Sequence, residues 1–281
     1  SSAASDVYKR QVKKNMKNGW FGNFEAGYGT DNRYAGSFNV STFTDNNQIS
    51  LVGGANNVNE QGFMDRGRGN FNSFGGSGGI NSSQRIGLNF NVGKTERFRV
   101  GGNVYYSHSD RKAISNTDTQ YLFPDSVSTQ SAGNSSRDRG HNVYGGFRME
   151  WKITENNTVD FRPDFSINFR NAEMNDTSLL RAGDVLRTLV NRNDNSRFND
   201  GTSWNVGGDL IYNHKVASHP GRSFSVRARY SFSNTRQYTT SWNDILYYLQ
   251  QDDSETLYQY IDGRQWNNTC LLYTSDAADE P

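Results

Sequence analysis

The stretch that decides the fold is HNVYGGFRMEWKI, residues 141–153. From Val143 to Ile153 every second residue is apolar or Gly, and the residues between them include Arg148 and Glu150. A repeat of two residues is that of a β-strand, because successive side chains of a strand point to opposite faces. The stretch therefore predicts a strand with one apolar face and one polar face.

The same alternation recurs along the chain and predicts nine complete strands and the start of a tenth. Their lengths reach or exceed the roughly 9–11 residues of a strand that spans a membrane, whereas strands of globular proteins average about 5–6. Pro163 lacks a backbone donor, so it predicts a lost ladder hydrogen bond or a bulge in its strand. The predicted strands are residues 19–29, 33–43, 48–56, 84–93, 97–109, 141–153, 158–171, 203–216 and 223–235, and the tenth begins at 265–267.

The connections between these strands are short and long in turn. Tight turns are predicted at residues 45–47, 94–96 and 155–157 and near Ser218, because Asn, Asp and similar residues accept the backbone angles of a turn. An outer-membrane β-barrel has short periplasmic turns and longer extracellular loops, so the first strand is predicted to run outward. The short connection at residues 30–32 departs from this pattern. The long loops are predicted at residues 57–83, 110–140, 172–201 and 236–264, and residues 179–190 form either a short helix or part of a loop.

The composition suits strands that are wet on one face. Hydrophobic residues make up only 33% of the 281 residues and the mean hydropathy is −0.86, yet aromatic residues make up 13%. A disordered chain would be poor in aromatic residues, and a soluble domain of this length would hold more apolar residues. The net charge of +1 gives no sign of a nucleic-acid surface, and no apolar run approaches the ~20 residues of a membrane-spanning helix.

Charges on the predicted polar faces favour a membrane barrel over the alternatives, a large soluble sandwich or a secreted solenoid. Such charges could not form a dry core without a severe desolvation cost. If the polar face lies inside, the apolar face lies outside, and outer-membrane lipid is the expected neighbour. The charged residues are Arg97, Arg99, Arg148, Glu150, Lys152, Asp160, Arg162, Asp164 and Asp209.

Aromatic residues near the strand ends predict two interfacial levels. Amphipathic rings gather where the bilayer meets water, so one aromatic level is expected on each side of the membrane. The periplasmic level holds Trp20, Trp151 and Tyr212, and the outer level holds Tyr28, Tyr34, Tyr106, Trp204 and Tyr230.

The two ends of the chain predict a different origin from the rest. Residues 1–11 and residues 270–280 can be encoded by one short DNA that is read on opposite strands, and this DNA looks like a transposon-type sequencing-library adapter. Segments of that kind are excluded before a fold is inferred. The sequence is therefore divided into an adapter-derived tail at 1–11, a partial outer-membrane β-barrel domain at 12–269 and a second adapter-derived tail at 270–281, which contains the only cysteine, Cys270.

Several stretches resemble TonB-dependent receptors of the Bacteroidetes type, and more narrowly their outer-membrane β-barrel family. The resemblance covers most of residues 12–269 and implies a barrel of about 22 strands with a plugged lumen, of which this chain would form the first nine or ten. It also implies partners: the receptor's own plug domain, the TonB energy-coupling complex and an unidentified solute. The stretches are residues 17–22 (KNGWFG), 27–34 (GYGTDNRY), 53–63 (GGANNVNEQGF) and 260–263 (YIDG).

The functional expectation is a fragment of a TonB-dependent outer-membrane transporter that imports a solute. A passive porin or a surface adhesion barrel is the alternative, and an enzyme is not expected because no nucleophile and base share one face. We predict no catalytic, cofactor-binding or metal-binding residues. The arginine-rich polar face would contact a plug, select anionic solutes or be simply solvated.

Several motifs suggest phosphate binding, catalysis or metal binding, but none has the pattern that the function requires. The Gly93–Lys94–Thr95 run lacks the earlier Gly of a phosphate-binding loop, and His108–Ser109–Asp110 cannot form a triad because neighbours on a strand face opposite sides. The spacing of the four histidines is not that of metal ligands, and acidic residues of the loops are expected to be solvated. The residues concerned are His108, His141, His214 and His219, and Asp194, Asp200, Asp252 and Asp253.

Overall fold

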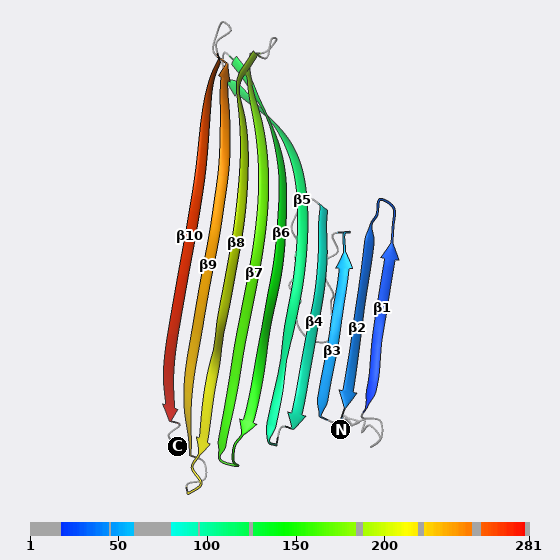
Figure 1. Cartoon of the computed structure of the whole chain (residues 1–281), viewed down its shortest axis with the longest axis vertical. Coiled ribbons are helices and arrows are strands. Elements are labelled where there is room, and N and C mark those ends of the chain that lie inside the picture. The colour runs from blue at the N-terminus through cyan, green and yellow to red at the C-terminus, as the bar shows by residue number, and fades with distance from the viewer. Residues whose placement is uncertain are drawn as a thin grey trace, which may run out of the picture.

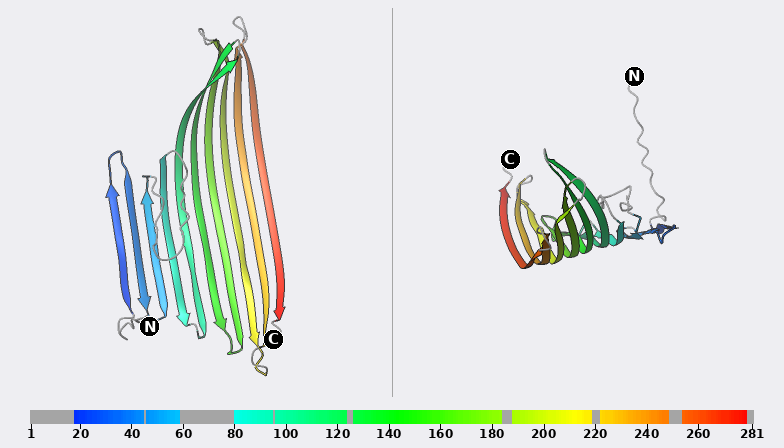
Figure 2. Two further views of the ribbon diagram at one scale, coloured as in Figure 1. Left: turned by 180° about the vertical axis from the view of Figure 1, so that it is seen from behind. Right: turned by 90° about the horizontal axis from the view of Figure 1, so that it is seen from above.

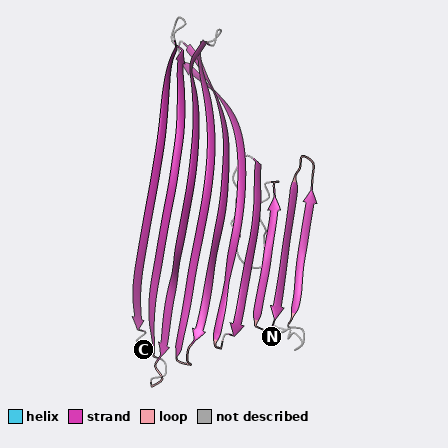
Figure 3. Ribbon diagram, viewed as in Figure 1, coloured by secondary structure: helices cyan, strands magenta, loops and turns pink. Residues whose placement is uncertain are grey.

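The computed structural model describes residues 18–44, 46–58, 80–94, 96–123, 126–183, 188–218, 222–248 and 254–278. They form one open antiparallel sheet in which each strand pairs with the next one along the chain (Figure 1). The prediction of an all-β, up-and-down sheet is confirmed, and Figure 3 shows strands throughout. No helix in the described part of the chain is long and apolar enough to cross a membrane. The strands are β1 Gly19–Tyr28, β2 Tyr34–Thr44, β3 Asn47–Asn56, β4 Ile80–Lys94, β5 Phe98–Phe123, β6 Ser126–Lys152, β7 Asn157–Ala182, β8 Thr188–Lys215, β9 Ser223–Tyr248 and β10 Ser254–Ala278.

The strand register places the apolar side chains of the alternating pattern on one face of the sheet, called the apolar face below. Directly paired residues lie on the same face of a sheet, so one row can be followed from strand to strand. The row that we use as a reference crosses nine strands and consists of apolar residues and glycines. Its members, from β1 to β9, are Gly22, Val40, Leu51, Leu88, Val104, Gly145, Phe165, Val206 and Phe232.

The opposite face, called the polar face, is the more crowded one. The described residues include only four buried polar side chains, and all four are serines of this face. The sheet is curled and not flat when it is seen from above (Figure 2). The buried serines are Ser41, Ser83, Ser107 and Ser241.

Three of the four predicted long loops are wrong, because their residues continue the strands. Residues 110–140 belong to β5 and β6, apart from 124 and 125, which lie outside the described residues. Residues 172–182 and 188–201 likewise extend β7 and β8, and residues 236–248 and 254–264 extend β9 and β10, whereas residues 184–187 and 249–253 lie outside the described residues. Polar residues occupy both faces there, and apolar ones such as Trp242 and Leu257 are scattered among them. No alternation therefore marks these segments as strands, yet backbone pairing continues without a continuous apolar face. Of the fourth predicted loop, residues 80–83 are part of β4 and residues 59–79 lie outside the described residues.

Three related predictions change with the loops. The short helix within residues 179–190 is wrong, because Leu179 pairs with Arg192 in the β7–β8 ladder, which then shifts register between Leu180 and Arg181. Short and long connections also do not alternate, because β5–β10 are joined by short connections at both ends. Strand β10 begins at Ser254 and not near residue 265, and it runs to Ala278, across the predicted boundary at 269/270. The origin of the two tails stays a prediction.

In Figure 1 the strand β1 runs upward, and the terms above and below refer to that direction. The short turns at the lower ends of the strands are where the sequence predicts them. Thr44 pairs with Asn47, and Lys94 pairs with Phe98. The strands on either side of the 155–157 turn end at Lys152 and begin at Asn157. Pro163 leaves Phe147 and Arg148 unmatched in the β6–β7 ladder while the register on either side stays the same, so the proline interrupts pairing and makes no bulge.

The apolar side chains form a band that slants across the sheet. On β1 the band runs from Trp20, two residues below the reference row, to Tyr28, six residues above it. On β9 it runs from Phe224, eight residues below the row, to Phe232 in the row itself. The band centre therefore drops by six residues over eight strand spacings. At about 3.3 Å per residue and about 4.8 Å between strands, this slope corresponds to strands tilted by roughly 30° from the normal to the band.

Aromatic residues mark the two edges of this band at a constant spacing. Trp20 and Tyr28 are eight residues apart on β1, and Trp204 and Tyr212 are eight residues apart on β8. Eight residues of strand span about 26 Å, and the apolar band of a membrane barrel is about 25 Å tall. Above the band β5–β10 continue as tall, paired strands, whereas β1–β4 end near its upper edge (Figure 1).

Candidate functional site: the charged belt of the polar face

The polar face has a neutral part and a charged part. On β1–β4 it carries mainly Asn, Ser, Gln and Gly, whereas on β5–β9 it carries nine charged residues at the height of the apolar band. These residues alternate with apolar ones: Asp160, for example, lies between Val159 and Phe161. We call them the charged belt. Its members are Arg99, Arg148, Glu150, Asp160, Arg162, Asp164, Asp209, Arg227 and Arg229.

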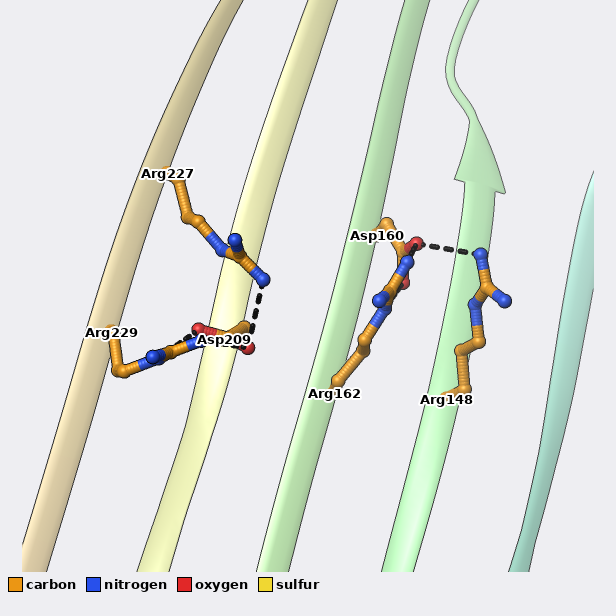
Figure 4. Close-up of polar contacts among 6 residues, drawn as sticks. All are labelled: Arg148, Asp160, Arg162, Asp209, Arg227 and Arg229. Carbon is orange, nitrogen blue, oxygen red and sulfur yellow. Dashed lines mark hydrogen bonds and ion pairs between the residues drawn. The ribbon is translucent and has the colours of Figure 1, made fainter. Parts of the chain in front are cut away.

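Asp160 is the first centre of the charged belt. It accepts hydrogen bonds from Arg162 through Nε at 3.0 Å and Nη2 at 2.5 Å, and from Arg148 Nη2 at 2.9 Å (Figure 4). Arg148 Nη2 also lies 2.7 Å from Glu150 Oε1. The Asp160 side chain is only 14% exposed, whereas those of its two arginine partners are 54% and 40% exposed. The carboxylate thus lies close to the backbone of the sheet, and both guanidinium groups extend away from it on the polar face.

Asp209 is the second centre, two strands from Arg148. Arg229 donates to it through Nε at 2.8 Å and Nη2 at 3.2 Å, and Arg227 donates through Nη2 at 3.2 Å (Figure 4). Arg162 and Asp209 are direct partners in the β7–β8 register, so the two centres are neighbours. Each centre therefore combines one carboxylate with two arginines, and the belt as a whole has more positive than negative side chains.

A hollow of about 250 Å³ lies beside the first centre. Gly101 contributes to its lining, and Arg99 and Arg148 extend beside it. Arg99 Nε donates to Asn91 Oδ1 at 2.8 Å, which holds that guanidinium in place. Guanidinium groups bind carboxylate and phosphate groups well, but the Glu150 carboxylate also lines the hollow and is paired with Arg148. The hollow therefore presents both signs of charge.

A second hollow, of about 270 Å³, lies over the neutral part. Its lining includes Ser41 and Ser50, whose hydroxyl groups are hydrogen bonded at 2.8 Å, and the stacked rings of Phe21 and Phe43, 5.1 Å apart. Hydroxyl, amide and aromatic groups are suited to neutral polar partners. The polar face thus offers two chemically different surfaces side by side.

The structure describes several of the residues to which the sequence analysis assigns no function. His108 and Asp110 share the apolar face and Ser109 lies on the other, as the strand geometry predicts. Asp194 is bonded to Arg192 and Thr177, and Asp252, Asp253 and His219 lie outside the described residues. Within the described ranges, no three His, Cys, Asp or Glu residues are grouped so that they could hold a metal ion.

Sequence reasoning missed one close pair of residues. The rings of His108 and His141 are stacked with their centroids 4.2 Å apart. The two residues are 33 positions apart in sequence, and only the register of the long β5–β6 hairpin brings them together. Because a loop is predicted at residues 110–140, the sequence does not predict which residues of β5 and β6 pair.

The chain was also compared with known proteins. No protein-family description matches it, and no curated protein sequence matches it.

Proposed function

We propose that this chain is part of the wall of an outer-membrane β-barrel, called the parent barrel below, and that the parent barrel is a plugged, TonB-dependent transporter that imports a solute. The observation that carries the membrane location is the slanting apolar band opposite the charged belt. Strands of membrane barrels tilt by about 35–45°, and a band that is level in the membrane must then slant across the strand ladder. The slope of roughly 30° is comparable with that tilt, although slightly smaller.

The exposure of the band supports a lipid neighbour. Trp20 and Phe24 are 78% and 76% exposed, and no apolar side chain of the described residues is buried. Soluble monomers rarely expose contiguous apolar patches larger than a few hundred Å². Lipid covers such a face, and water or a plug covers the opposite one.

The orientation now rests on the reach of the hairpins and not on loop lengths. The β5–β6 hairpin turns after Phe123, 19 residues above Val104 of the reference row, whereas the lower end of β5 is only six residues below it. Outer-membrane barrels extend farther on the extracellular side. We therefore place the tall hairpins outside the cell and the short turns in the periplasm, with β1 running outward.

The assignment as a plugged transporter rests on the sequence resemblance and is supported by the charged belt. A soluble plug requires a wall with hydrogen-bonding and charged groups, and the belt supplies both signs of charge in fixed pairs. Outer-membrane lipid, the plug, the TonB complex and an unidentified solute are the proposed partners. Catalysis and nucleic-acid binding are not part of the proposal.

Single-cysteine labelling tests the membrane location. Val104→Cys and Phe165→Cys lie in the band, and Ser166→Cys lies beside them on the polar face. Asn175→Cys is the matched control, because it lies on the same face of β7 as Phe165 but ten residues farther up. In outer membranes that contain the parent barrel without other cysteines, a water-soluble maleimide should label Asn175→Cys and leave Val104→Cys and Phe165→Cys unlabelled until detergent is added.

Lipid quenching completes that test. A bimane probe on Val104→Cys or Phe165→Cys should be quenched by brominated acyl chains, and one on Ser166→Cys should not. Rapid aqueous labelling of both band positions in intact membranes would show that the apolar face contacts water and would defeat the membrane location.

The complete reading frame separates the transporter from a passive porin. A plugged transporter requires a plug-like domain upstream and about 22 strands, whereas a porin has about 16–18 strands and no plug. A reading frame without a plug would overturn the transporter and leave the membrane wall intact.

A further inference from the structure

A basic cluster lies on the apolar face immediately above the apolar band. In β5 and β6 the band ends with Tyr106 and Val143, a directly opposed pair two residues above the reference row. The next pair is His108 and His141, and above it Asp110 faces Arg139 and Lys112 faces Arg137. These three pairs occupy four residues of strand, or about 13 Å. We call His108, Lys112, Arg137, Arg139 and His141, with Asp110, the basic cluster.

The single acid of the cluster is surrounded by its three cations. Arg137 donates to Asp110 through Nε at 2.9 Å and Nη2 at 2.5 Å. The hydrogen bond to Arg137 lowers the pKa of Asp110, and the charges of Lys112 and Arg139 lower it further. One cation is therefore matched by Asp110, and two positive charges remain. Glu173 of β7, which faces Arg137, offsets part of this excess.

The histidine pair adds one hydrogen-bond donor below the cations. His108 Nδ1 lies 3.0 Å from the carbonyl oxygen of Gly140, so Nδ1 carries the proton and donates. His141 Nδ1 lies 2.9 Å from the hydroxyl oxygen of Tyr106. With the Tyr106 hydroxyl donating to His141 Nδ1, the His141 proton lies on Nε2 and can be donated to a group outside the protein, whereas Nε2 of the neutral His108 ring is an acceptor. The flanking strands place uncharged Gln84 and Phe169 beside the two rings.

The position of the basic cluster identifies its partner. Positive side chains just beyond the hydrocarbon region meet the headgroups of the lipids whose chains cover the band, and each contributes about 1 kcal/mol of attraction to an anionic surface. We propose that Lys112, Arg139 and His141 bind the phosphate group of a lipid headgroup in the outer leaflet. This inference rests on the proposed membrane location, and it adds a specific lipid chemistry to it.

Native mass spectrometry of the parent barrel in neutral detergent tests the proposal. The probe is phosphatidic acid, and diacylglycerol with the same acyl chains is the phosphate-free reference. Phosphatidic acid should bind and diacylglycerol should not. Lys112→Gln combined with Arg139→Gln should weaken binding by about 10- to 30-fold, because two contacts of about 1 kcal/mol each are lost.

Two further variants should respond differently: one should bind the lipid more tightly, and the other is a control. Asp110→Asn removes the acid and frees Arg137, so phosphatidic acid should bind several-fold more tightly. Arg192→Gln removes one positive charge on the same face of β8, 14 residues above Val206 of the reference row, and should leave binding within twofold of the wild type.

The outcomes separate the proposal from its rivals. Equal weakening by Arg192→Gln, or none by the double variant, would overturn it. Full displacement of the lipid by inorganic phosphate at millimolar concentration would show a free-anion site and overturn the lipid assignment. Cysteine labelling of the band reports on the membrane location independently, so a protected band without phosphate-dependent lipid binding defeats this inference alone.

Discussion

Phe165 lies directly opposite Gly145 in the β6–β7 ladder, and its ring occupies the space that a side chain at position 145 would need. A methyl group on Gly145 would lie 2.7 Å from Phe165 Cε1 and 2.8 Å from the carbonyl oxygen of Asn103. The same relation recurs where Phe38 covers Gly53 and where Tyr105 covers Gly87. An aromatic ring folded over a facing glycine covers the backbone and fixes the register of the pair.

Gly145→Ala should therefore destabilise the parent barrel. The ring and the backbone carbonyl cannot both yield, and overpacking of this kind costs about 1–3 kcal/mol. Gly146→Ala is the matched control on the same strand, because its methyl group would come no closer than 3.7 Å to any atom. Urea unfolding in detergent micelles, followed by tryptophan fluorescence, measures both free energies. Equal stability of the two variants would contradict the role of the Phe165 ring.

Loss of the Asp160 carboxylate should cost more than loss of the Glu150 carboxylate. Asp160 accepts from Arg148 and Arg162 and is 14% exposed, whereas Glu150 contacts Arg148 alone and is 33% exposed. We expect Asp160→Asn to lower the free energy of unfolding by roughly 1–2 kcal/mol and Glu150→Gln by less than about 1 kcal/mol. Both effects should shrink in 1 M NaCl, and an unchanged Asp160→Asn variant would show that the belt does not hold the sheet together.

Acid should weaken the β5–β6 hairpin above the band. The hydrogen bond from Arg137 lowers the pKa of Asp110 below its ordinary value of 3.8. A lowered folded-state pKa stabilises the fold above the unfolded-state value, and this stabilisation is lost as the pH falls through the folded-state value. Stability should therefore drop below about pH 4, and Asp110→Asn should remove part of that drop. Asp118→Asn, on the same face of β5 and without an ion-pair partner among the described residues, is the matched control for the loss of one carboxylate.

The tall hairpins should resist hydrogen exchange. Residues 111–119 and 131–139 pair along β5 and β6, so their amides are protected by ladder hydrogen bonds. Exchange followed by mass spectrometry should show these segments exchanging many times more slowly than unstructured peptides of the same sequence. Exchange at the rate of unstructured peptides would show that these residues form the loop that the sequence predicts.

Alternation is sufficient to predict the lower half of the sheet. The apolar residues of 141–153 require a strand, and the short turns near residues 45, 95 and 155 follow from their Asn, Lys and Glu residues. Both faces of β6 and β7 are assigned as the structure has them, including Arg148 and Asp160 on one face. The grouping of Asp160 with two arginines could not be predicted, because it depends on the register between strands.

The upper half could not be predicted because it lacks the signal. Between Asp110 and Gly140 polar residues occupy both faces, as they do in a loop. What makes this region a strand pair is its continuation from the paired residues below, which keeps each residue opposite its partner up to Phe123 and Ser126. Neither the short helix nor the loop considered for residues 179–190 is found in the described part of that segment, because Leu179 extends a ladder that begins 22 residues earlier, at Asn157.

Strand β5 extends farther upward than β4, so the upper part of β5 has an edge without a described partner. Ile80 pairs with Lys112, and no described residue pairs with that side of β5 above this point. The eleven residues from Ala113 to Phe123 hold one charge, Asp118, and end in Tyr121, Leu122 and Phe123. A long edge with few charges is a template for adding another strand. Unless another segment covers it, this edge should make the protein associate through β5 as its concentration rises during refolding, and a lysine in place of Thr117 should suppress that association.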